Sequence, residues 1–360
     1  ASTFSKGPVG KIVNIGTERD LINIFGAPVE ANAGDWLVAS EFLRYGGQLA
    51  VVRATTGVEN ATASGTGVLI ADSVAFDAGV TSEKFAARDA GTDGNNLRVV
   101  IVDKVADVKM TKATHGLSVG DTLSDGATTD HEVTVVIDAN TVGIKEGGGT
   151  AVSGNGFTKS AFTNSDWNSL PIGDTGLTYK AIGARPGTSA YASERFLSAD
   201  EVHVAVVDTS TNTVVERNLF LSKLSDGKTP EGASSYWKDY VNEFSSFIYA
   251  GAALTSTEFT TAGEDSGATA ASYGATSASP KVLAYIKSTA GGALSGGTDD
   301  YAYTAGEIGA AYNEFLDTEE TTVDFVLMGG SMGSESDTLA KAGSVAGVAN
   351  TRKDCIAFIS

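Results

Sequence analysis

Cysteine, proline and histidine are scarce in this chain of 360 residues, which contains one cysteine, six prolines and three histidines. A single cysteine, Cys355, excludes an internal disulfide framework and is compatible with a reducing compartment. Because Cys355 begins an apolar run that extends to Ile359, we expect its side chain to be buried. No apolar run approaches the ~18–20 residues that a membrane-spanning helix requires, so we expect no membrane partner.

Positive charge is also in short supply: 25 Lys and Arg stand against 44 Asp and Glu, which gives a formal net charge of −19. A nucleic-acid-binding protein needs a basic face that displaces counterions from phosphates, whereas the basic residues here are scattered. We therefore expect no nucleic-acid partner. The acidic excess favours solubility at high local concentration. A hydrophobic content of 42% is typical of a folded chain.

The first 55 residues follow an α/β pattern that begins with two predicted helices. Thr17 and Asp20 have the spacing of a capping box, which predicts a helix that starts after Thr17 and ends at Gly26. A second helix is predicted from about Asp35 to the glycine pair that begins at Gly46.

Two short apolar runs are predicted to be buried strands. Leu49–Val52 lacks the alternation of a half-exposed strand, which indicates a strand covered on both faces. Leu97–Val102 follows a turn rich in Gly, Asp and Asn and has the same character. Arg53 ends the first run, and we expect it to form a structural or interfacial ion pair.

Composition changes along the chain and predicts its domain organisation. Residues 56–85 are rich in Ala, Gly, Ser and Thr, and residues 104–185 carry β-branched runs divided by Gly, Asp and Asn. We predict an α/β core, a mixed sheet with flanking helices, that is assembled from discontinuous segments. These segments are 1–55, 86–103 and 186–360; a small insertion covers 56–85, and a β-rich, outward-facing insertion covers 104–185 with its strands within 105–160.

The last third of the chain returns to the α/β pattern. A core-facing helix is predicted to start at Trp237, with Tyr240, Val241, Phe244 and Ile248 on its buried face. The other predicted elements are a hairpin of Val202–Val207 and Thr213–Leu221, a capped helix after Thr304, and a β-α-β crossover of strand Val323–Met328, helix Asp337–Asn350 and a buried strand at 355–359.

One motif of catalysis occurs, at Ser331. Gly329-Gly-Ser331-Met-Gly333 follows a predicted strand and satisfies the G-x-S-x-G pattern of the nucleophile elbow in α/β hydrolases. That fold places its histidine base after the serine, whereas His115, His131 and His203 all precede Ser331. A hydrolase that uses Ser331 stays an alternative, and we predict no catalytic residue.

Candidate ligand sites are weak as well. Asp93–Asn96 and Asp121–Asp130 contain oxygen ligands, but neither has EF-hand spacing, and such clusters are usually turns. His115 and His131 have no cysteine nearby, which disfavours zinc. Asn60-Ala-Thr62 matches a glycosylation acceptor. We expect no metal and no cofactor.

Four blocks of sequence carry a resemblance to a known family. They are Gly7-Pro8 through Phe25-Gly-Ala-Pro28, the block FLRYGGQLAVVRA at 42–54, Gly91–Leu97, and a block from Leu294-Ser-Gly-Gly297 through Thr304-Ala-Gly to Arg352-Lys-Asp-Cys-Ile356. In this order and spacing they are similar to the tail sheath proteins of contractile bacteriophages, the large myovirus type. Arg53 and Arg352 lie in these blocks and are our candidate interaction residues.

The resemblance implies a structural role and no enzymatic activity. It implies a homo-oligomer that polymerises helically as a sheath around the tail tube protein, meets baseplate and tail terminator proteins, and contracts to drive the tube through the host envelope for genome ejection. The location would be the virion, after assembly in the host cytoplasm. Relative to the family, we expect the amino-terminal arm and the carboxy-terminal domain to be missing from this segment. A related contractile injection system, or a surface adhesin with an Ig-like insert, stays an alternative.

Overall fold

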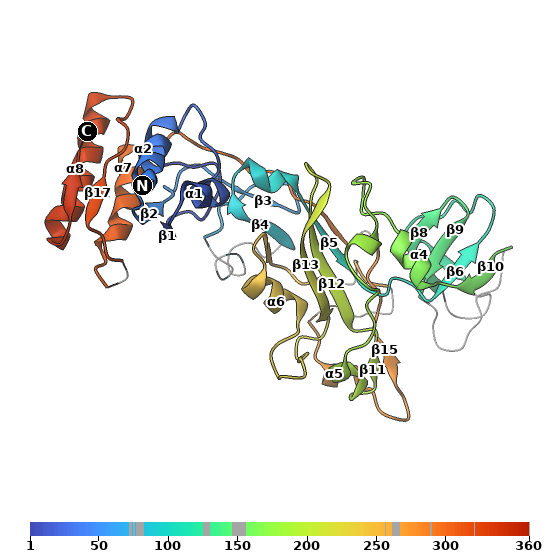
Figure 1. Cartoon of the computed structure of the whole chain (residues 1–360). Coiled ribbons are helices and arrows are strands. Elements are labelled where there is room, and N and C mark those ends of the chain that lie inside the picture. The colour runs from blue at the N-terminus through green and yellow to red at the C-terminus, as the bar shows by residue number, and fades with distance from the viewer. Residues whose placement is uncertain are drawn as a thin grey trace. The chain divides into compact units, whose positions relative to one another are not determined.

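The computed structural model describes residues 1–71, 74, 76, 83–124, 130–145, 156–255, 257–260, 267–288, 290–319 and 321–359. The chain divides into two compact units (Figure 1). The first unit comprises Ala1–Phe76, Ala87–Asn95 and Ser295–Ser360, and the second comprises Asp77–Ala86 and Asn96–Leu294. Both mix helices with sheets and join segments distant in sequence, so the predicted fold class, α/β from discontinuous segments, is confirmed.

The first unit is built from short sheets and α-helices. Its elements are β1 (Ile12–Ile15), α1 (Glu18–Phe25), α2 (Ala33–Arg44), β2 (Leu49–Val52), β3 (Asn60–Thr62), η1 (Thr92–Asn96), α7 (Ala305–Asn313), η4 (Glu314–Leu316), β17 (Phe325–Leu327), α8 (Glu335–Arg352) and β18 (Ile356–Phe358). Strands β1 and β2 pair antiparallel, whereas β17 and β18 pair in parallel and are joined by α8. The predicted β-α-β crossover is therefore confirmed.

The helix starts of this unit follow the predicted capping chemistry. The Thr17 hydroxyl accepts the Asp20 amide at the start of α1, and Gly26 ends that helix with φ +86°. Thr304 and Glu307 form a complete capping box at the start of α7. Each cap satisfies backbone amides that have no partner within the helix. Both boundaries depend on local contacts, which explains why the sequence predicts them.

Strand β2 lies between two hydrophobic clusters. Val51 belongs to a cluster with Phe25 and Trp36, whereas its neighbour Val52 belongs to a cluster with Tyr312 and other side chains of α7 and α8. Successive side chains of a strand point to opposite faces, so both faces of β2 are covered. The prediction drawn from the unbroken apolar run is confirmed.

The last strand departs from the prediction. In β18, Ile356 is 60% exposed and Phe358 is 52% exposed, so the expected burial of 355–359 is wrong for this chain. Cys355 is half-buried against the cluster of α7 and α8, and its predicted full burial is wrong as well. The apolar run does form a strand, but the side chains of the described residues bury only part of its surface.

The second unit contains most of the strands. Its elements are β5 (Leu97–Val102), β6 (Val108–Thr111), β7 (Thr122–Ser124), β8 (Asp130–Asp138), β9 (Thr141–Ile144), β10 (Thr158–Ala161), α4 (Asn164–Ser169), η2 (Tyr179–Ala181), α5 (Ala190–Ser193), β11 (Leu197–Ser198), β12 (Glu201–Asp208), β13 (Thr213–Ser222), α6 (Trp237–Phe244), β14 (Ile248–Ala250), η3 (Ala270–Tyr273), β15 (Lys281–Val282) and β16 (Gly291–Ala293). Strand β4 (Phe85–Ala90) contains the boundary between the units.

Two larger sheets organise this unit. One has the order β13-β12-β5-β16 and contains the predicted hairpin of β12 and β13. The other has the order β10-β6-β9-β8-β7, so the strands predicted within 105–160 form a sheet of their own. That 104–185 is an outward-facing insertion stays a prediction. The short helix α4 was not predicted, although Thr163 and Asp166 form its capping box.

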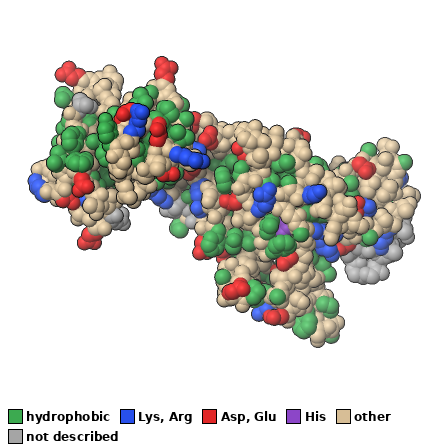
Figure 2. All heavy atoms as spheres, viewed as in Figure 1, with side chains coloured by type: hydrophobic (Ala, Val, Ile, Leu, Met, Phe, Trp, Pro, Cys, Tyr) green, Lys and Arg blue, Asp and Glu red, His purple; other side chains and the backbone are tan. Residues whose placement is uncertain are grey.

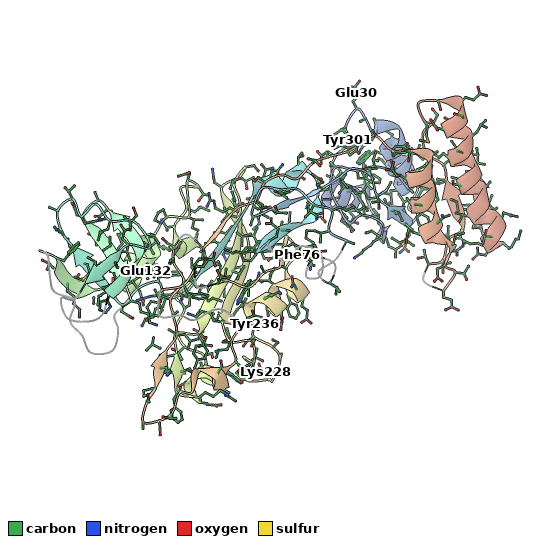
Figure 3. The ribbon with its side chains drawn as sticks, turned by 180° about the vertical axis from the view of Figure 1, so that it is seen from behind. Glu30, Phe76, Glu132, Lys228, Tyr236 and Tyr301 are labelled. Carbon is green, nitrogen blue, oxygen red and sulfur yellow. The ribbon has the colours of Figure 1, made fainter. Side chains whose placement is uncertain are left out.

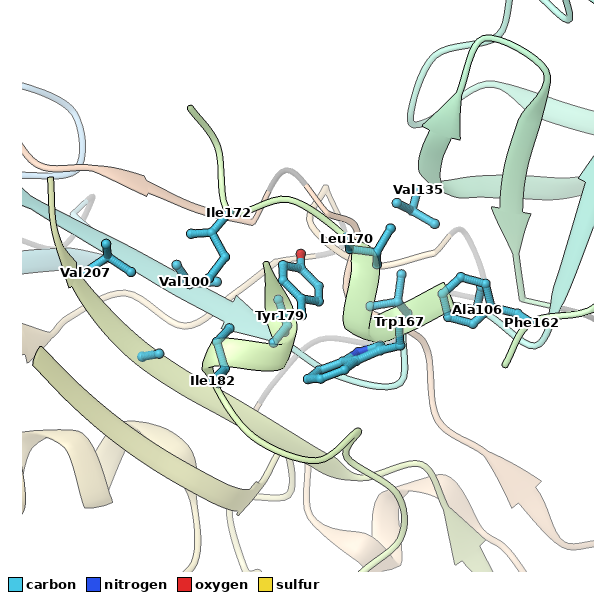
Figure 4. Close-up of a cluster of buried hydrophobic side chains, with 13 residues drawn as sticks. Val100, Ala106, Val135, Phe162, Trp167, Leu170, Ile172, Tyr179, Ile182 and Val207 are labelled. Carbon is cyan, nitrogen blue, oxygen red and sulfur yellow. The ribbon is translucent and has the colours of Figure 1, made fainter. Parts of the chain in front are cut away.

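A cluster around Trp167 packs α4 and η2 against both sheets (Figure 4). Its members include Val100 of β5 and Val135 of β8. The Trp167 indole N–H donates to the Asp103 carbonyl at 2.9 Å, and the ring stands edge-on to Tyr179. A buried tryptophan with a satisfied N–H contributes apolar area without an unpaired donor, so this cluster anchors the return from the five-stranded sheet.

Helix α6 is shorter than predicted. It ends at Phe244, and the Ser245 hydroxyl accepts the amides of Phe247 and Ile248 beyond it. Such a serine turn competes with helix continuation. Phe244 is 57% exposed, so its predicted place on the buried face is wrong, whereas Trp237 is fully buried as predicted.

Candidate functional site

A groove of about 440 Å³ opens in the first unit between β2 and β17. Side chains of α2 and of α7 with η4 line it together with residues of the two strands. The apolar residues that line the groove are Ala1, Phe4, Val38, Ala39, Phe42, Leu49, Ala50, Val51, Tyr312, Phe315, Val323, Phe325, Val326, Leu327 and Met328. The groove is thus mainly apolar, flanked by two strands, with helix side chains contributing to its walls.

One residue that lines this groove, Asp35, has a carboxylate with four hydrogen-bond donors around it. Asp35 of α2 accepts the Ser2 hydroxyl at 2.6 Å and the Gly330 amide at 2.5 Å. The Lys341 ammonium lies 3.2 Å from the same carboxylate, and the Tyr303 hydroxyl lies 3.3 Å from it. Burial raises the pKa of Tyr303, and the negative charge of Asp35 raises it further.

Lys341 is a fully buried cation of helix α8. It occupies the helix face that also buries Val345 and Val348, and it donates to the Gly330 carbonyl at 2.9 Å. The network therefore ties α2, the β17–α8 turn and α8 together. Sequence analysis missed it, although a lysine at an apolar position of a helix repeat is a signal that a buried partner exists.

Arg53 is only 1% exposed and has a structural role within the chain. Its guanidinium donates to the carbonyls of Gly7 at 2.9 Å and Ala90 at 2.7 Å. Burial lowers the pKa of Arg53, and the nearby charges of Asp89 and Asp299 oppose that shift. Arg53 therefore fixes the segment at Gly7 and the end of β4 to the end of β2; a direct role between copies stays a prediction.

Arg352, the last residue of α8, joins three backbone carbonyls and a carboxylate. It donates to Phe315 at 2.6 Å, to Asp317 at 3.0 Å and to Thr321 at 2.8 Å, all carbonyl oxygens. Two of its nitrogens also contact the Asp354 carboxylate, at 2.9 and 3.0 Å. The side chain holds the segment after η4 against the end of α8. Its role in contacts between copies stays a prediction.

The geometry around Ser331 does not support hydrolysis. Ser331 is exposed in the turn between β17 and α8, a turn whose neighbouring Gly330 amide is bound to Asp35. His115, His131 and His203 belong to the second unit, and in the described residues each has a ring nitrogen hydrogen-bonded to a backbone carbonyl. The hydrolase alternative thus gains no support.

The candidate ligand motifs take structural roles. Asn95 donates to the Gly297 carbonyl and accepts the Gly297 amide, which fixes η1. Asn60 is fully buried, and its amide donates to the Ala87 carbonyl, so the folded chain does not present it for glycosylation. The described residues contain no group of three or more acidic, histidine or cysteine side chains suited to a metal. Part of 121–130 lies outside the described residues.

The second unit contains a buried ion pair that sequence analysis also missed. Lys223 follows β13 and lies 2.9 Å from Asp103, and both side chains are almost fully buried. Lys223 also donates to the Ala284 carbonyl, and Asp103 accepts the Ile286 amide. A further pair joins Glu132 of β8, labelled in Figure 3, to Lys287. These contacts connect both larger sheets of the second unit to the segment 284–287.

The surface shows mixed charge and exposed apolar side chains. Figure 2 shows Lys and Arg interspersed with Asp and Glu, without a continuous basic patch on the face that is drawn.

Hydrophobic side chains gather on this face over α7 and β17. The ring of Phe325 of β17 stands edge-on to that of Phe358 of β18, with centroids 5.5 Å apart, and both side chains are about half exposed. Among the helices of the described residues, none has the length and apolarity needed to cross a membrane.

Comparison with known proteins adds what the geometry alone does not give. Residues 1–54 match the family model for the tail sheath protein Gp18 domain III N-terminal region. A tail sheath protein of Salmonella phage ViI is 23% identical over 269 residues, which make up 65% of this chain and 42% of that protein. A tail sheath protein of Vibrio phage KVP40 is 39% identical over 61 residues, 16% of this chain and 9% of that protein. These matches support a phage tail sheath protein.

A solved structure of a sheath tail protein from Listeria innocua matches as well, with 12% identity and a TM-score of 0.37. That match covers 98% of this chain and 43% of the other. The chain spans less than half the length of the curated relatives it matches. The resemblance to tail sheath proteins drawn from the four sequence blocks is confirmed.

Proposed function

We propose that this protein is the repeating subunit of a contractile phage tail sheath. Copies polymerise helically around the tail tube and contract to drive the tube through the host envelope, which leads to genome ejection. The match of residues 1–54 to the sheath family model carries the proposal. These residues build β1, α1, α2 and β2, which form one wall of the groove and supply Asp35 to the buried network.

An open helical array requires heterologous contacts, in which one surface of a copy meets a different surface of the next. The exposed aromatic pair of β17 and β18 is a candidate for one such surface, because Phe325 and Phe358 together present apolar area to solvent. Leu37 of α2, also more than half exposed, is a candidate for another. Burial of apolar area contributes about 25 cal/mol per Å².

Contraction draws its energy from subunit packing. If the extended array lies only ~1–2 kcal/mol per subunit above the contracted one, the size of a single net hydrogen bond, the total over many copies becomes large. Such a device needs rigid subunits, and the buried pairs Lys341–Asp35 and Lys223–Asp103 stiffen the two units separately. The proposed partners are further copies, the tail tube protein, and baseplate and tail terminator proteins, in the virion after assembly in the host cytoplasm.

Sedimentation velocity tests the proposal. The full-length protein, expressed alone and measured over a hundredfold concentration range, is expected to form large polymers of broad size distribution. The test variant is the same protein with Phe325→Ser and Phe358→Ser. It should keep the circular dichroism spectrum of the parent but sediment as smaller species. A full-length protein that stays monomeric at every concentration and salt condition would oppose the sheath assignment.

A further inference from the structure

The second unit contains a smaller cavity, of about 150 Å³, beside strand β5. Its walls come from β5, from β16 and the segment before it, from the loop that follows α4, and from Tyr179 of η2. One water molecule takes up about 30 Å³ of liquid. The cavity is therefore large enough for a small ligand or for one side chain of another molecule.

A positioned cation lines this cavity. Arg98 of β5 is half-buried, and among the described residues its guanidinium forms no ion pair and no hydrogen bond. Its Nε is sealed from solvent and has no acceptor. Gly173 packs directly on the guanidinium, because a Cβ at that position would stand 2.6 Å from the Arg98 Cζ. This close approach holds a positive charge beside the cavity without a counter-charge.

Two hydroxyl-bearing side chains line the same cavity. Tyr179 is only 3% exposed, and the hydroxyl end of its ring points away from Ile182 (Figure 4). The Ser288 amide donates to the Thr134 carbonyl, which leaves the side chain of Ser288 for another contact. Within the part of the chain that the structure describes, neither hydroxyl has a hydrogen-bond partner. Since a buried tyrosine hydroxyl usually finds one, the cavity calls for an acceptor.

The charges around the cavity favour an anion as that acceptor. Burial raises the pKa of Tyr179, and the negative charge of Asp103 raises it further, so the hydroxyl stays protonated and can donate. Asp103 is itself paired with Lys223 at 2.9 Å, and so it does not cancel the charge of Arg98. The cavity thus combines a permanent positive charge with neutral donors.

We propose that this cavity binds a carboxylate group, held by the Arg98 guanidinium and by the hydroxyls of Tyr179 and Ser288. Arginine pairs with carboxylates through parallel N–H donors, and the Nη groups serve here because Nε is sealed. Val100 and Ile172 also line the cavity and suit the carbon atoms next to a carboxylate.

Two sources carry this chemistry. One is a small organic acid in solution. The other is an acidic side chain of another copy, since the chain has 44 Asp and Glu against 25 Lys and Arg. The proposal does not depend on the proposed function.

Nuclear magnetic resonance of the arginine side chains tests the site. Sodium acetate is titrated into the nitrogen-15-labelled chain at pH 7, with sodium chloride used to keep the ionic strength constant. The Arg98 Nε–H signal, assigned by its absence from the Arg98→Lys variant, is expected to shift and to saturate with a dissociation constant of about 10 mM or less. The signal of Arg195, which pairs with Glu194 in the same unit, is the internal control and should not saturate.

A tyrosine variant tests the second donor. Tyr179→Phe keeps the ring but removes the hydroxyl, so it should weaken acetate binding about three- to tenfold. Tyr191→Phe changes a tyrosine of the same unit that does not line the cavity, and it should leave the dissociation constant unchanged. An acetate response that does not saturate at Arg98, or that is equal in Tyr179→Phe and in the parent, overturns the proposal.

Dilution without acetate distinguishes the two sources. If the Arg98 signal moves toward its acetate-bound position as protein concentration rises, the carboxylate is an acidic side chain of another copy. If the signal stays constant over the same range while acetate still binds, the site takes a free organic acid. Each result supports a carboxylate site, provided that the acetate titration saturates.

Discussion

The ammonium of Lys341 lies 3.2 Å from the carboxylate of Asp35, although 306 positions separate the two residues in the sequence. Both belong to the first unit, and Asp35 lines its groove. Because the Asp35 carboxylate also binds the Gly330 amide, the pair joins both terminal segments of the chain through one charge cluster. Stability of this unit should therefore respond strongly to loss of either partner.

Replacement of Lys341 by methionine should lower the free energy of unfolding of the first unit by about 3–5 kcal/mol. Methionine fills similar volume but leaves the Asp35 charge without its cation, and an uncompensated buried charge is costly. The measurement is urea unfolding followed by circular dichroism, fitted with separate transitions where the two units unfold separately.

Lys11→Met is the matched control for this change, because Lys11 is an exposed lysine of the same unit. Its effect should stay within about 0.5 kcal/mol. A Lys341→Met variant as stable as the Lys11→Met variant would contradict the importance assigned to the pair.

Replacement of Arg352 by lysine should destabilise the chain by about 1–3 kcal/mol, although the charge is kept. A lysine cannot reach the carbonyls of Phe315, Asp317 and Thr321 together with the Asp354 carboxylate, so buried acceptors lose their donors. Thermal unfolding followed by differential scanning calorimetry measures the loss. Arg44→Lys, at an exposed ion pair, is the control and should leave the melting temperature unchanged.

The free energy of unfolding should decrease as the pH is lowered below about 6.5, because His203 resists protonation in the folded chain. Burial lowers the pKa of this imidazole, which donates from Nε2 to the Ala184 carbonyl and accepts the Phe220 amide at Nδ1. A proton on Nδ1 would face that N–H donor. Since the unfolded chain binds the proton more readily, acidification through the unfolded pKa favours unfolding, by at most about 1.4 kcal/mol per pH unit.

The check is the free energy of unfolding measured between pH 8 and pH 5 in the parent protein and in His203→Asn. The parent should lose stability more steeply than the variant across pH 6.5 to 5, whatever their difference at pH 8. His115→Asn is the matched control for loss of a histidine in the same unit. Equal slopes for parent and His203→Asn would refute the assignment.

Local signals explain what the sequence could predict. The starts of α1 and α7 were predictable because Thr17 and Thr304 satisfy amides only three residues away. Strand β2 was predictable because an unbroken apolar run has few alternatives. The end of α6 was not predicted, since the Ser245 turn competes with a helical pattern that continues beyond it.

Contacts between distant segments explain what was missed. Nothing near Lys341 in sequence indicates Asp35, and the Asn60 motif gave no sign that its amide is buried against Ala87. The exposure of Phe358 could not be predicted for a different reason. An apolar strand indicates that its side chains are buried by some partner, but the sequence does not say whether that partner is another segment of the chain or another copy. The interaction role of Arg53 and Arg352 stays a prediction, and the carbonyl partners of their side chains became apparent only from the structure.

Electron cryomicroscopy of the full-length protein, purified without other tail components, tests the central claim most directly. The account predicts hollow helical tubes in which every subunit contains both units described above, with β17 and β18 covered by another part of the assembly. Discrete closed oligomers, or subunits in which those strands face solvent throughout the assembly, would contradict it.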